Sequence, residues 1–594
     1  MLGDEAGAGA NVAPLMDSDW RHSSDNLQAS GKSPSTWQAT CLIGQIMASI
    51  VLVVAIAVKK SDTLHWGYTI SVGATAAAFA FVGLLLLALG SRYSSGRHPA
   101  DKVIFAAPVL GDMSLSSVVA LFLFVWWGIA VYILTFYGPF VDTTNGYFAV
   151  WIGFASSIGG IGAALPGLQA SASATSFSVS LIGLGVCAVV VGLDLTAAGG
   201  LSRQMTYGMV VAVLTFAAVA MMLLQELAGA PLDATLARNV HIVIVLIWGL
   251  AALWLTFTGP FIATGNGYFA LWAGLVCASR LVLDVQKARI AAALSNETLA
   301  AMWGQLVAAV VLILAVSALP PQTTTCWGYA LAVGIVSAAV SLVAALLLEN
   351  LAGRVPLLPL PPSVAAASGA AALTLNGLLA TFLFLWWGVG TGILTIHGPF
   401  LSTGNGYFSA WLGFGFSLLG IGLSLSRTKA AATSGRATLA VLAICSLVIV
   451  ATASPHIADD AKHRTQATTA VVVACTTLVR ILVDLFLAQH GASCGALLEK
   501  VRAAATFLAW TLLASWTSFT GPFAETGNGF FAAWAGVLCS VLLLLARLPP
   551  LTSAATTRDE VGEASAFATP VADAGVQPLQ STAEPEGSAT GTWE

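Results

Sequence analysis

Charge is the scarcest property of this chain. Asp, Glu, Lys and Arg make up 8% of its 594 residues, whereas hydrophobic residues make up 57%. A soluble domain carries about 25% charged residues, so this scarcity excludes an ordinary soluble fold. It also leaves no basic patch for binding nucleic acid. The mean hydropathy of +0.87 therefore predicts an integral membrane protein.

Motifs for catalysis and for cofactor binding are absent as well. The sequence has no phosphate-binding Gly-x-x-x-x-Gly-Lys, no dinucleotide fingerprint, no zinc-binding helix motif and no nucleophile elbow. Its eight cysteines are scattered without a repeated pair or a metal-ligand spacing, which is typical of buried small hydrophobes. We therefore expect that the protein is not an enzyme and binds neither a cofactor nor a metal ion.

One segment of the sequence leaves metal binding open as an alternative. His456, Asp459, Asp460 and His463 have a spacing that could gather a metal ion. The same stretch contains Lys462 and also fits an ordinary hydrated loop, which is the interpretation we favour.

Long apolar runs account for most of the sequence. A membrane-spanning helix needs about 20 apolar residues, whereas barrel strands would be short and alternating. Sixteen such runs occur, so we predict an all-α integral membrane protein with about 16 transmembrane helices. The first residues lack a basic stretch that leads into a short apolar one, so the first span is expected to act as the targeting signal.

A motif recurs four times in the same register. A Trp stands eleven residues before Gly-Pro-Phe; two variable residues, a Thr, one further residue and Asn-Gly follow, and a second Trp closes the motif. The four copies are Trp127, Gly138, Pro139, Phe140, Thr143, Asn145, Gly146 and Trp151; Trp248, Gly259, Pro260, Phe261, Thr264, Asn266, Gly267 and Trp272; Trp387, Gly398, Pro399, Phe400, Thr403, Asn405, Gly406 and Trp411; and Trp510, Gly521, Pro522, Phe523, Thr526, Asn528, Gly529 and Trp534.

The repeat divides the chain into units of four spans each. The predicted units are 40–165, 166–285, 286–425 and 426–547, between acidic tails 1–39 and 548–594 whose composition predicts disorder. Units one and three share further residues: Trp66-Gly67-Tyr68 recurs as Trp327-Gly328-Tyr329. This alternation predicts a pseudo-twofold pairing of two eight-helix halves.

The motif itself predicts a tight helical hairpin. The first Trp lies roughly 16 Å along the helix from Gly-Pro, hence near mid-membrane. Gly-Pro stops the third helix of each unit, and the following Thr and Asn are good N-cap residues for the fourth. The aromatic residues after Asn-Gly are expected to rest against lipid headgroups. A structural turn explains the whole motif.

A sharper alternative is that the four hairpins converge on a pore mouth or ligand pocket. The residue before the motif Thr is Asp142, Ala263, Ser402 or Glu525, so four charges cannot form a ring. Asp142 and Glu525 could still make a lopsided cation site for transport.

Charges inside spans are the other candidates for function. Arg280 with Asp284, and Arg480 with Asp484, are each four residues apart and can pair on one helix face. Snorkelling toward the membrane surface with a local partner is the simpler account, and a coupling or proton-relay role is the alternative.

Basic residues indicate the orientation. Both tails and the even-numbered loops hold sixteen Lys and Arg, against five in the odd-numbered loops. Basic loops stay in the cytoplasm, so both termini are expected there and the hairpins on the other side, in a membrane that the sequence does not specify.

In layout, each unit resembles a MARVEL-type or related tetraspan membrane protein, with four spans, cytoplasmic termini and two short outer loops. The resemblance implies a role in organising membrane domains, vesicle traffic or membrane apposition. We therefore expect a non-enzymatic organiser or scaffold in tandem-tetraspan form. Its partners would be the lipid bilayer and other membrane proteins or further copies of itself. The alternative is a transporter or channel with a pathway between the pseudo-symmetric halves.

Overall fold

The computed structural model describes residues 34–59, 61–90, 103–107, 111–165, 179–200, 202–228, 232–285, 297–322, 324–350, 356–359, 372–425, 436–490 and 495–547. Within these ranges the structure is mainly helical, and fourteen helices are long and apolar enough to span a membrane. The chain is thus an all-α, multi-pass membrane protein. The two expected tails lie outside the described residues, apart from the stretch that begins helix α2.

The helices of the first half form two groups. The first holds α2 (Pro34–Ala57), α3 (Trp66–Gly90), α4 (Leu115–Tyr132), which continues as the π-helical turn η1 (Ile133–Tyr137), and α5 (Asn145–Ala164). The second holds α7 (Val179–Ala198), α8 (Arg203–Leu227), α9 (Ala234–Phe257) and α10 (Asn266–Val285).

The second half repeats this plan. The third group holds α12 (Glu297–Ser317), α13 (Trp327–Asn350), α15 (Leu375–Ile396) and α16 (Asn405–Leu425). The fourth holds α18 (Arg436–Asp459), α19 (Arg464–Gln489), α20 (Ala496–Phe519) and α21 (Asn528–Leu545).

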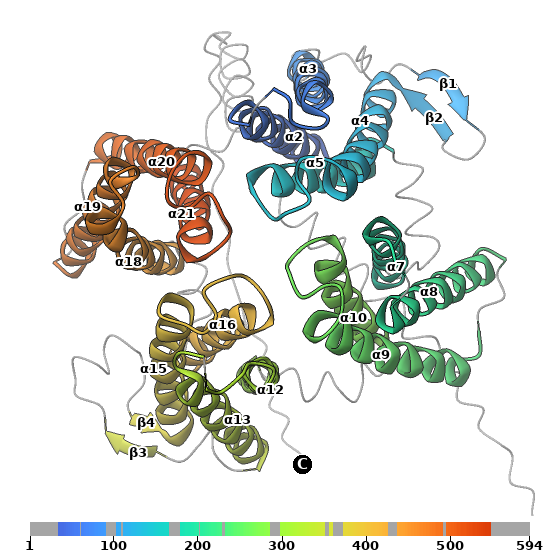
Figure 1. Ribbon diagram of the computed structural model, residues 1–594. Coiled ribbons are helices and arrows are strands. Elements are labelled where there is room, and N and C mark those ends of the chain that lie inside the picture. The colour runs from blue at the N-terminus through green and yellow to red at the C-terminus, as the bar shows by residue number, and fades with distance from the viewer. Residues whose placement is uncertain are drawn as a thin grey trace, which may run out of the picture.

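Each group packs as a four-helix bundle with its own core. The largest side chain at the heart of each core is the first Trp of the motif, and Trp127, Trp248, Trp387 and Trp510 are all 0% exposed. The bundles lie around a common axis, with α5, α10, α16 and α21 nearest to it (Figure 1). The motif hairpins, which join the third helix of each bundle to the fourth, therefore meet at the centre.

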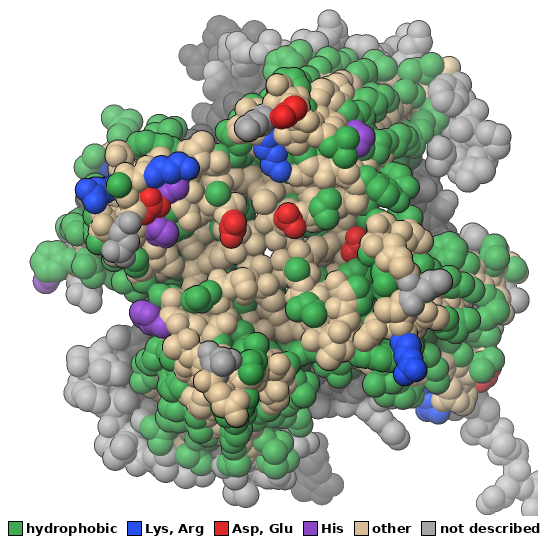
Figure 2. Space-filling model, viewed as in Figure 1, with side chains coloured by type: hydrophobic (Ala, Val, Ile, Leu, Met, Phe, Trp, Pro, Cys, Tyr) green, Lys and Arg blue, Asp and Glu red, His purple; other side chains and the backbone are tan. Residues whose placement is uncertain are grey.

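The outer walls of the bundles are apolar. Large hydrophobic side chains such as Leu246, Leu314 and Leu482 are more than 40% exposed and face away from the bundle cores. Figure 2 shows hydrophobic side chains around the rim of the molecule, and mainly backbone and side chains of other types toward its centre. A rim of this kind suits lipid, because hydrocarbon does not penalise exposed apolar surface.

Bundles one and three share two features that the described residues of bundles two and four do not show. A short antiparallel strand pair precedes the third helix of bundle one, β1 (Val103–Ala107) with β2 (Gly111–Ser114), and of bundle three, β3 (Pro356–Pro359) with β4 (Ala372–Thr374). In the same two bundles a second Trp, Trp126 or Trp386, donates to the carbonyl of Val72 or Val333.

Candidate functional site: the central hairpin ring

In each bundle two glycines, the one after the motif Asn and the one two residues beyond the second motif Trp, make room for aromatic rings. A Cβ on Gly146 would lie 2.2 Å from the ring of Phe140, and one on Gly153 would lie 2.5 Å from the ring of Trp127. Both are closer than real Cβ contacts. The other three bundles repeat the arrangement: Gly267 on Phe261 and Gly274 on Trp248, Gly406 on Phe400 and Gly413 on Trp387, and Gly529 on Phe523 and Gly536 on Trp510. These glycines are thus required by packing.

One backbone hydrogen bond of the turn recurs in every bundle. The N–H of the motif Phe donates to a carbonyl six residues earlier, as in Phe140 to Leu134 at 3.1 Å and Phe261 to Leu255 at 3.1 Å. Phe400 and Phe523 make the equivalent bonds to Leu394 and Thr517. This wide turn carries the Phe ring back over the start of the next helix.

The four motif threonines meet at the axis. Their side-chain oxygens lie 3.0 Å apart from Thr143 to Thr264 and from Thr264 to Thr403. The ring continues with 3.2 Å from Thr403 to Thr526 and closes with 3.1 Å from Thr526 to Thr143. A planar square with these sides would place opposite oxygens about 4.4 Å apart, which leaves less than a water molecule's width between their surfaces. A ring of that size would not let a water molecule pass.

The motif asparagines fasten each bundle to the one before it. The Asn266 side-chain amide donates to the carbonyl and hydroxyl oxygens of Thr135 at 2.9 and 3.0 Å. The equivalent pairs are Asn405 with Thr256, Asn528 with Thr395 and Asn145 with Ser518. All four asparagines are at most 8% exposed. The last pair joins bundle one to bundle four and closes the cycle.

The second Trp of each motif completes the clamp. Its indole N–H donates to the side-chain oxygen of the Asn in the next bundle, as in Trp151 to Asn266 at 3.0 Å. Trp272, Trp411 and Trp534 donate to Asn405, Asn528 and Asn145 at 3.1, 3.0 and 2.9 Å. Asn405 also accepts a bond from the Tyr268 hydroxyl at 2.9 Å. Each Asn thus bonds twice to the bundle before it, donating to its third helix and accepting from its fourth.

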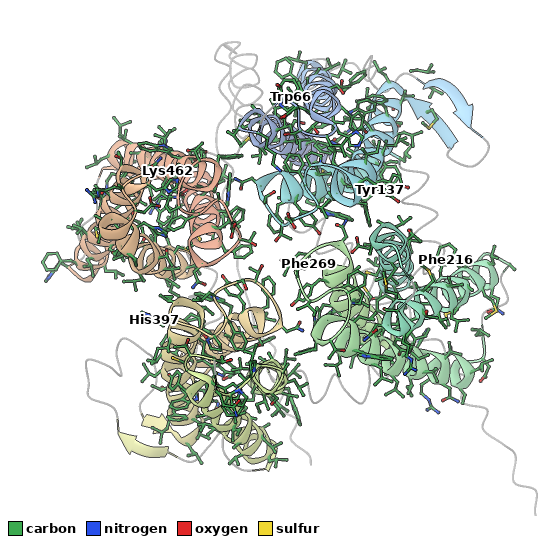
Figure 3. All side chains as sticks on the ribbon, in the orientation of Figure 1. Trp66, Tyr137, Phe216, Phe269, His397 and Lys462 are labelled. Atoms are coloured by element: carbon green, nitrogen blue, oxygen red, sulfur yellow. The ribbon has the colours of Figure 1, made fainter. Side chains whose placement is uncertain are left out.

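Aromatic rings form a layer beside the threonines. Phe408 lies 6.1 Å from Phe269 and 6.3 Å from Phe531, and Phe531 lies 6.2 Å from Phe148, measured between ring centroids. Figure 3 shows Phe269 on α10 pointing into the space between the bundles. These contacts bury apolar surface where the four bundles meet.

Two sequence-based interpretations change here. The aromatic residues that directly follow Asn-Gly do not rest against headgroups: Tyr147, Tyr268, Tyr407 and Phe530 are each 3% exposed and lie inside the assembly. The hairpins also converge, so the motif is more than four separate turns. Both differences result from tertiary packing at the axis, which local sequence patterns do not encode.

The hydroxyl residues that accept hydrogen bonds from the asparagines were not predicted from the sequence. Thr135, Thr256, Thr395 and Ser518 each stand three residues before the motif Gly-Pro. The sequence signal for these residues is that a hydroxyl side chain occupies the same position in all four copies of the repeat. It was easy to overlook because Ser and Thr are common in transmembrane helices, where they bond back to their own backbone, as Thr135 does to Val131.

A few acidic side chains lie near the centre of the face shown in Figure 2. Asp142 and Glu525 are exposed. The Lys59 ammonium donates to the Pro139 carbonyl at 2.6 Å; partial burial lowers the pKa of Lys59, and the charge of Asp142 opposes that shift. Asp194 of α7 accepts the backbone N–H of Gly267 at 2.7 Å and so stabilises the start of α10. The hairpin face is therefore negative near the axis, with Lys59 beside one of its carboxylates.

The two charge pairs predicted within spans have different surroundings. Arg480 lies 3.6 Å from Asp484, and Asp484 also accepts a bond from Arg502, so α19 and α20 are joined by a small ionic cluster. Arg280 is exposed, and the side chain of Asp284 lies outside the described residues. The described pair is therefore part of a contact inside bundle four and lies far along the helix from the hairpin ring.

The histidine-rich loop forms a local network. Asp460 accepts bonds from the ring of His463 at 2.5 Å and from the backbone N–H groups of Lys462 and His463 at 3.0 and 3.2 Å. The hydrogen bond from His463 lowers the pKa of Asp460. Among the described residues no group of three or more potential ligands could hold a metal ion, and the side chain of Asp459 is not among them.

Comparison of the chain with protein-family models, with curated proteins and with solved structures finds no match.

Proposed function

We propose that the protein is a non-enzymatic membrane scaffold: four tetraspan bundles held as one closed ring by their hairpins, which present a fixed apolar wall to lipid and to other membrane proteins. The observation that carries the proposal is the cyclic Asn, Trp and Thr network. Its polar atoms pair with one another across bundle boundaries and leave few to bind or conduct a substrate.

The resemblance of each bundle to MARVEL-type tetraspan proteins agrees with this role. The proposal places the hairpin face on the exoplasmic side and both termini in the cytoplasm, as the basic loops indicate. The alternation of bundle features supports an origin by two successive duplications. A closed ring of fused units would fix the number and spacing of wall surfaces, which separate units could not do.

A second candidate, a gated pathway along the axis, is favoured by one observation. Four hydroxyl oxygens surround the axis, and Asp142 and Glu525 stand next to them on the exposed hairpin face. Rings of oxygen beside acidic residues occur at the mouths of cation channels. In this structure the ring is shut, so conduction would require the four hydroxyls to separate.

Flux measurements on the full chain in proteoliposomes distinguish the two candidates. The scaffold predicts no flux of monovalent or divalent cations, in the wild type or in Thr264→Ala, which removes one hydroxyl from the ring. Cation flux in the wild type that Asp142→Ala or Glu525→Ala abolishes would establish the pathway and refute the scaffold.

A positive test of the scaffold uses proximity labelling in cells. The wild type should label a reproducible set of neighbouring membrane proteins. Asn528→Leu breaks the clamp between bundles three and four. This variant should still insert in the membrane but should label a different and less reproducible set of proteins. Asn376→Leu is the control, because the side-chain oxygen of Asn376 has no partner in the structure. An unchanged set in Asn528→Leu would count against the scaffold.

A further inference from the structure

An apolar crevice lies between the first and second bundles. It has a volume of about 470 Å³ and is lined from both sides, by α4 and α5 on one wall and by α7 and α8 on the other. Phe216, labelled in Figure 3, contributes to the α8 wall. The lining contains no charged residue, and its single hydroxyl belongs to Tyr132.

The crevice has the dimensions of a lipid chain. Its lining on α7 runs from Ile182 to Leu193, about 16 Å along the helix, so a chain that enters from the hairpin side can reach past the middle of the span. A cavity of about 150 Å³ holds one benzene, so this crevice of about 470 Å³ has room for roughly eighteen carbon atoms. That is the content of one long acyl chain.

The polar end of the crevice is at the hairpin side. The Tyr132 hydroxyl lies 3.4 Å from the hydroxyl of Tyr137, the last residue before the motif Gly-Pro, and the Tyr132 side chain is 43% exposed. A hydroxyl there can donate to an ester carbonyl of a phospholipid, which lies at the boundary between headgroup and hydrocarbon.

The walls are held in place by contacts within the protein. The ring of Phe154 is held 5.6 Å from Phe124 and 6.2 Å from Trp151, and Trp151 is fixed by its bond to Asn266. A chain in the crevice would touch protein on two sides, whereas ordinary boundary lipid touches it on one. Preformed walls reduce the ordering cost of binding, so this position should hold a lipid longer than the surrounding surface does.

We propose that this crevice is a binding site for one acyl chain of a phospholipid from the leaflet on the hairpin side, with the ester carbonyl next to Tyr132. The bound chain fills the gap between bundles one and two below their hairpin contact. The site does not depend on whether the ring acts as a scaffold or as a pathway.

Native mass spectrometry of the full chain in mild detergent tests the proposal. After delipidation, palmitoyl-oleoyl phosphatidylcholine is added back to wild type, Val186→Trp and Val189→Trp. The side chains of Val186 and Val189 line the crevice and are 50% and 42% exposed, so the larger residue fills the space without disturbing a core. Val213→Trp is the control, because Val213 lies on α8 outside the crevice and is 58% exposed.

Wild type and Val213→Trp should retain one phospholipid more than either crevice variant. Equal retention in all four proteins would overturn the proposal. A second measurement needs wild type alone: dilauroyl phosphatidylcholine, with 12-carbon chains, should bind at least several-fold more weakly than the palmitoyl-oleoyl lipid. Equal binding of the two, or displacement of the phospholipid by cholesterol at equal concentration, would also refute an acyl-chain site.

Discussion

Asn145 and Ser518 stand 373 positions apart in the sequence, yet the Asn145 side-chain amide donates to both the carbonyl and the hydroxyl oxygen of Ser518 at 3.0 Å. This contact turns a linear series of four bundles into a closed ring. The Asn145 oxygen accepts the indole N–H of Trp534 at 2.9 Å, so one side chain holds two helices of bundle four.

Removing this clamp should destabilise the ring. Asn145→Leu leaves the Ser518 carbonyl and the Trp534 indole without partners in a buried site. We expect a loss of about 1–3 kcal/mol in the free energy of unfolding, because unsatisfied buried polar groups carry that cost. Chemical unfolding in detergent micelles measures it. Asn376→Leu, at a position whose side-chain oxygen is unpaired, should change stability far less.

Adding a methyl group at Gly413 should lower the stability of the protein, whereas adding one at Gly415 should not. A Cβ on Gly413 would lie 2.5 Å from the Trp387 ring, whereas one on Gly415, two residues along the same helix, meets nothing within 4 Å. We expect Gly413→Ala to destabilise the protein by about 1–3 kcal/mol through overpacking, and Gly415→Ala to be neutral or slightly stabilising. Thermal unfolding of both variants checks this, and equal effects would mean that the Trp387 ring can move aside.

The ionic cluster of bundle four gives a third prediction. Asp484→Asn removes the carboxylate that faces Arg480 and accepts the bond from Arg502. Two neighbouring cations would then remain between α19 and α20 without their counter-ion. We expect lower stability and, because the repulsion between them is electrostatic, partial recovery at high salt. Unfolding at low and high ionic strength measures both. If stability did not change at either salt concentration, the cluster would have no structural role.

The hydrogen bonds around Asp460 should weaken at low pH. The pKa of Asp460 is lower in the folded protein than its ordinary value, so its contribution to stability is complete above the ordinary range for a carboxyl. That contribution is lost as the pH falls through the lowered pKa. The amides of Lys462 and His463, which donate to Asp460, should lose hydrogen-exchange protection in that acid range. Asp460→Asn should have weaker protection at neutral pH and less change on acidification.

Much of the fold follows from local sequence. Apolar runs of bilayer length predicted helices, and sixteen helices are present within the described residues. The start of each fourth helix at the motif Asn also follows locally: α5 begins at Asn145 and α10 at Asn266. Gly-Pro cannot continue a helix, so the break before it depends on the residues themselves.

The contacts of the candidate site could not be predicted from local sequence. The motif identified the threonines, asparagines and tryptophans, but the partners of Asn145 belong to bundle four, more than 300 residues away. Spacing within a repeat cannot say whether the repeats face one another. The same limitation led to the expectation that Tyr147 anchors at the membrane surface, where it is in fact buried.

By itself, the sequence determined the membrane environment, the helical class and the position of each turn, because hydropathy, helix propensity and the Gly-Pro break act over a few residues. Only the tertiary structure decided that four hairpins form one ring, that Thr143 bonds with Thr264 and Thr526, and that Gly413 must accommodate Trp387. The physical reason is that hydrogen bonds and close packing between bundles depend on how whole helices are oriented in space, and no short segment carries that information.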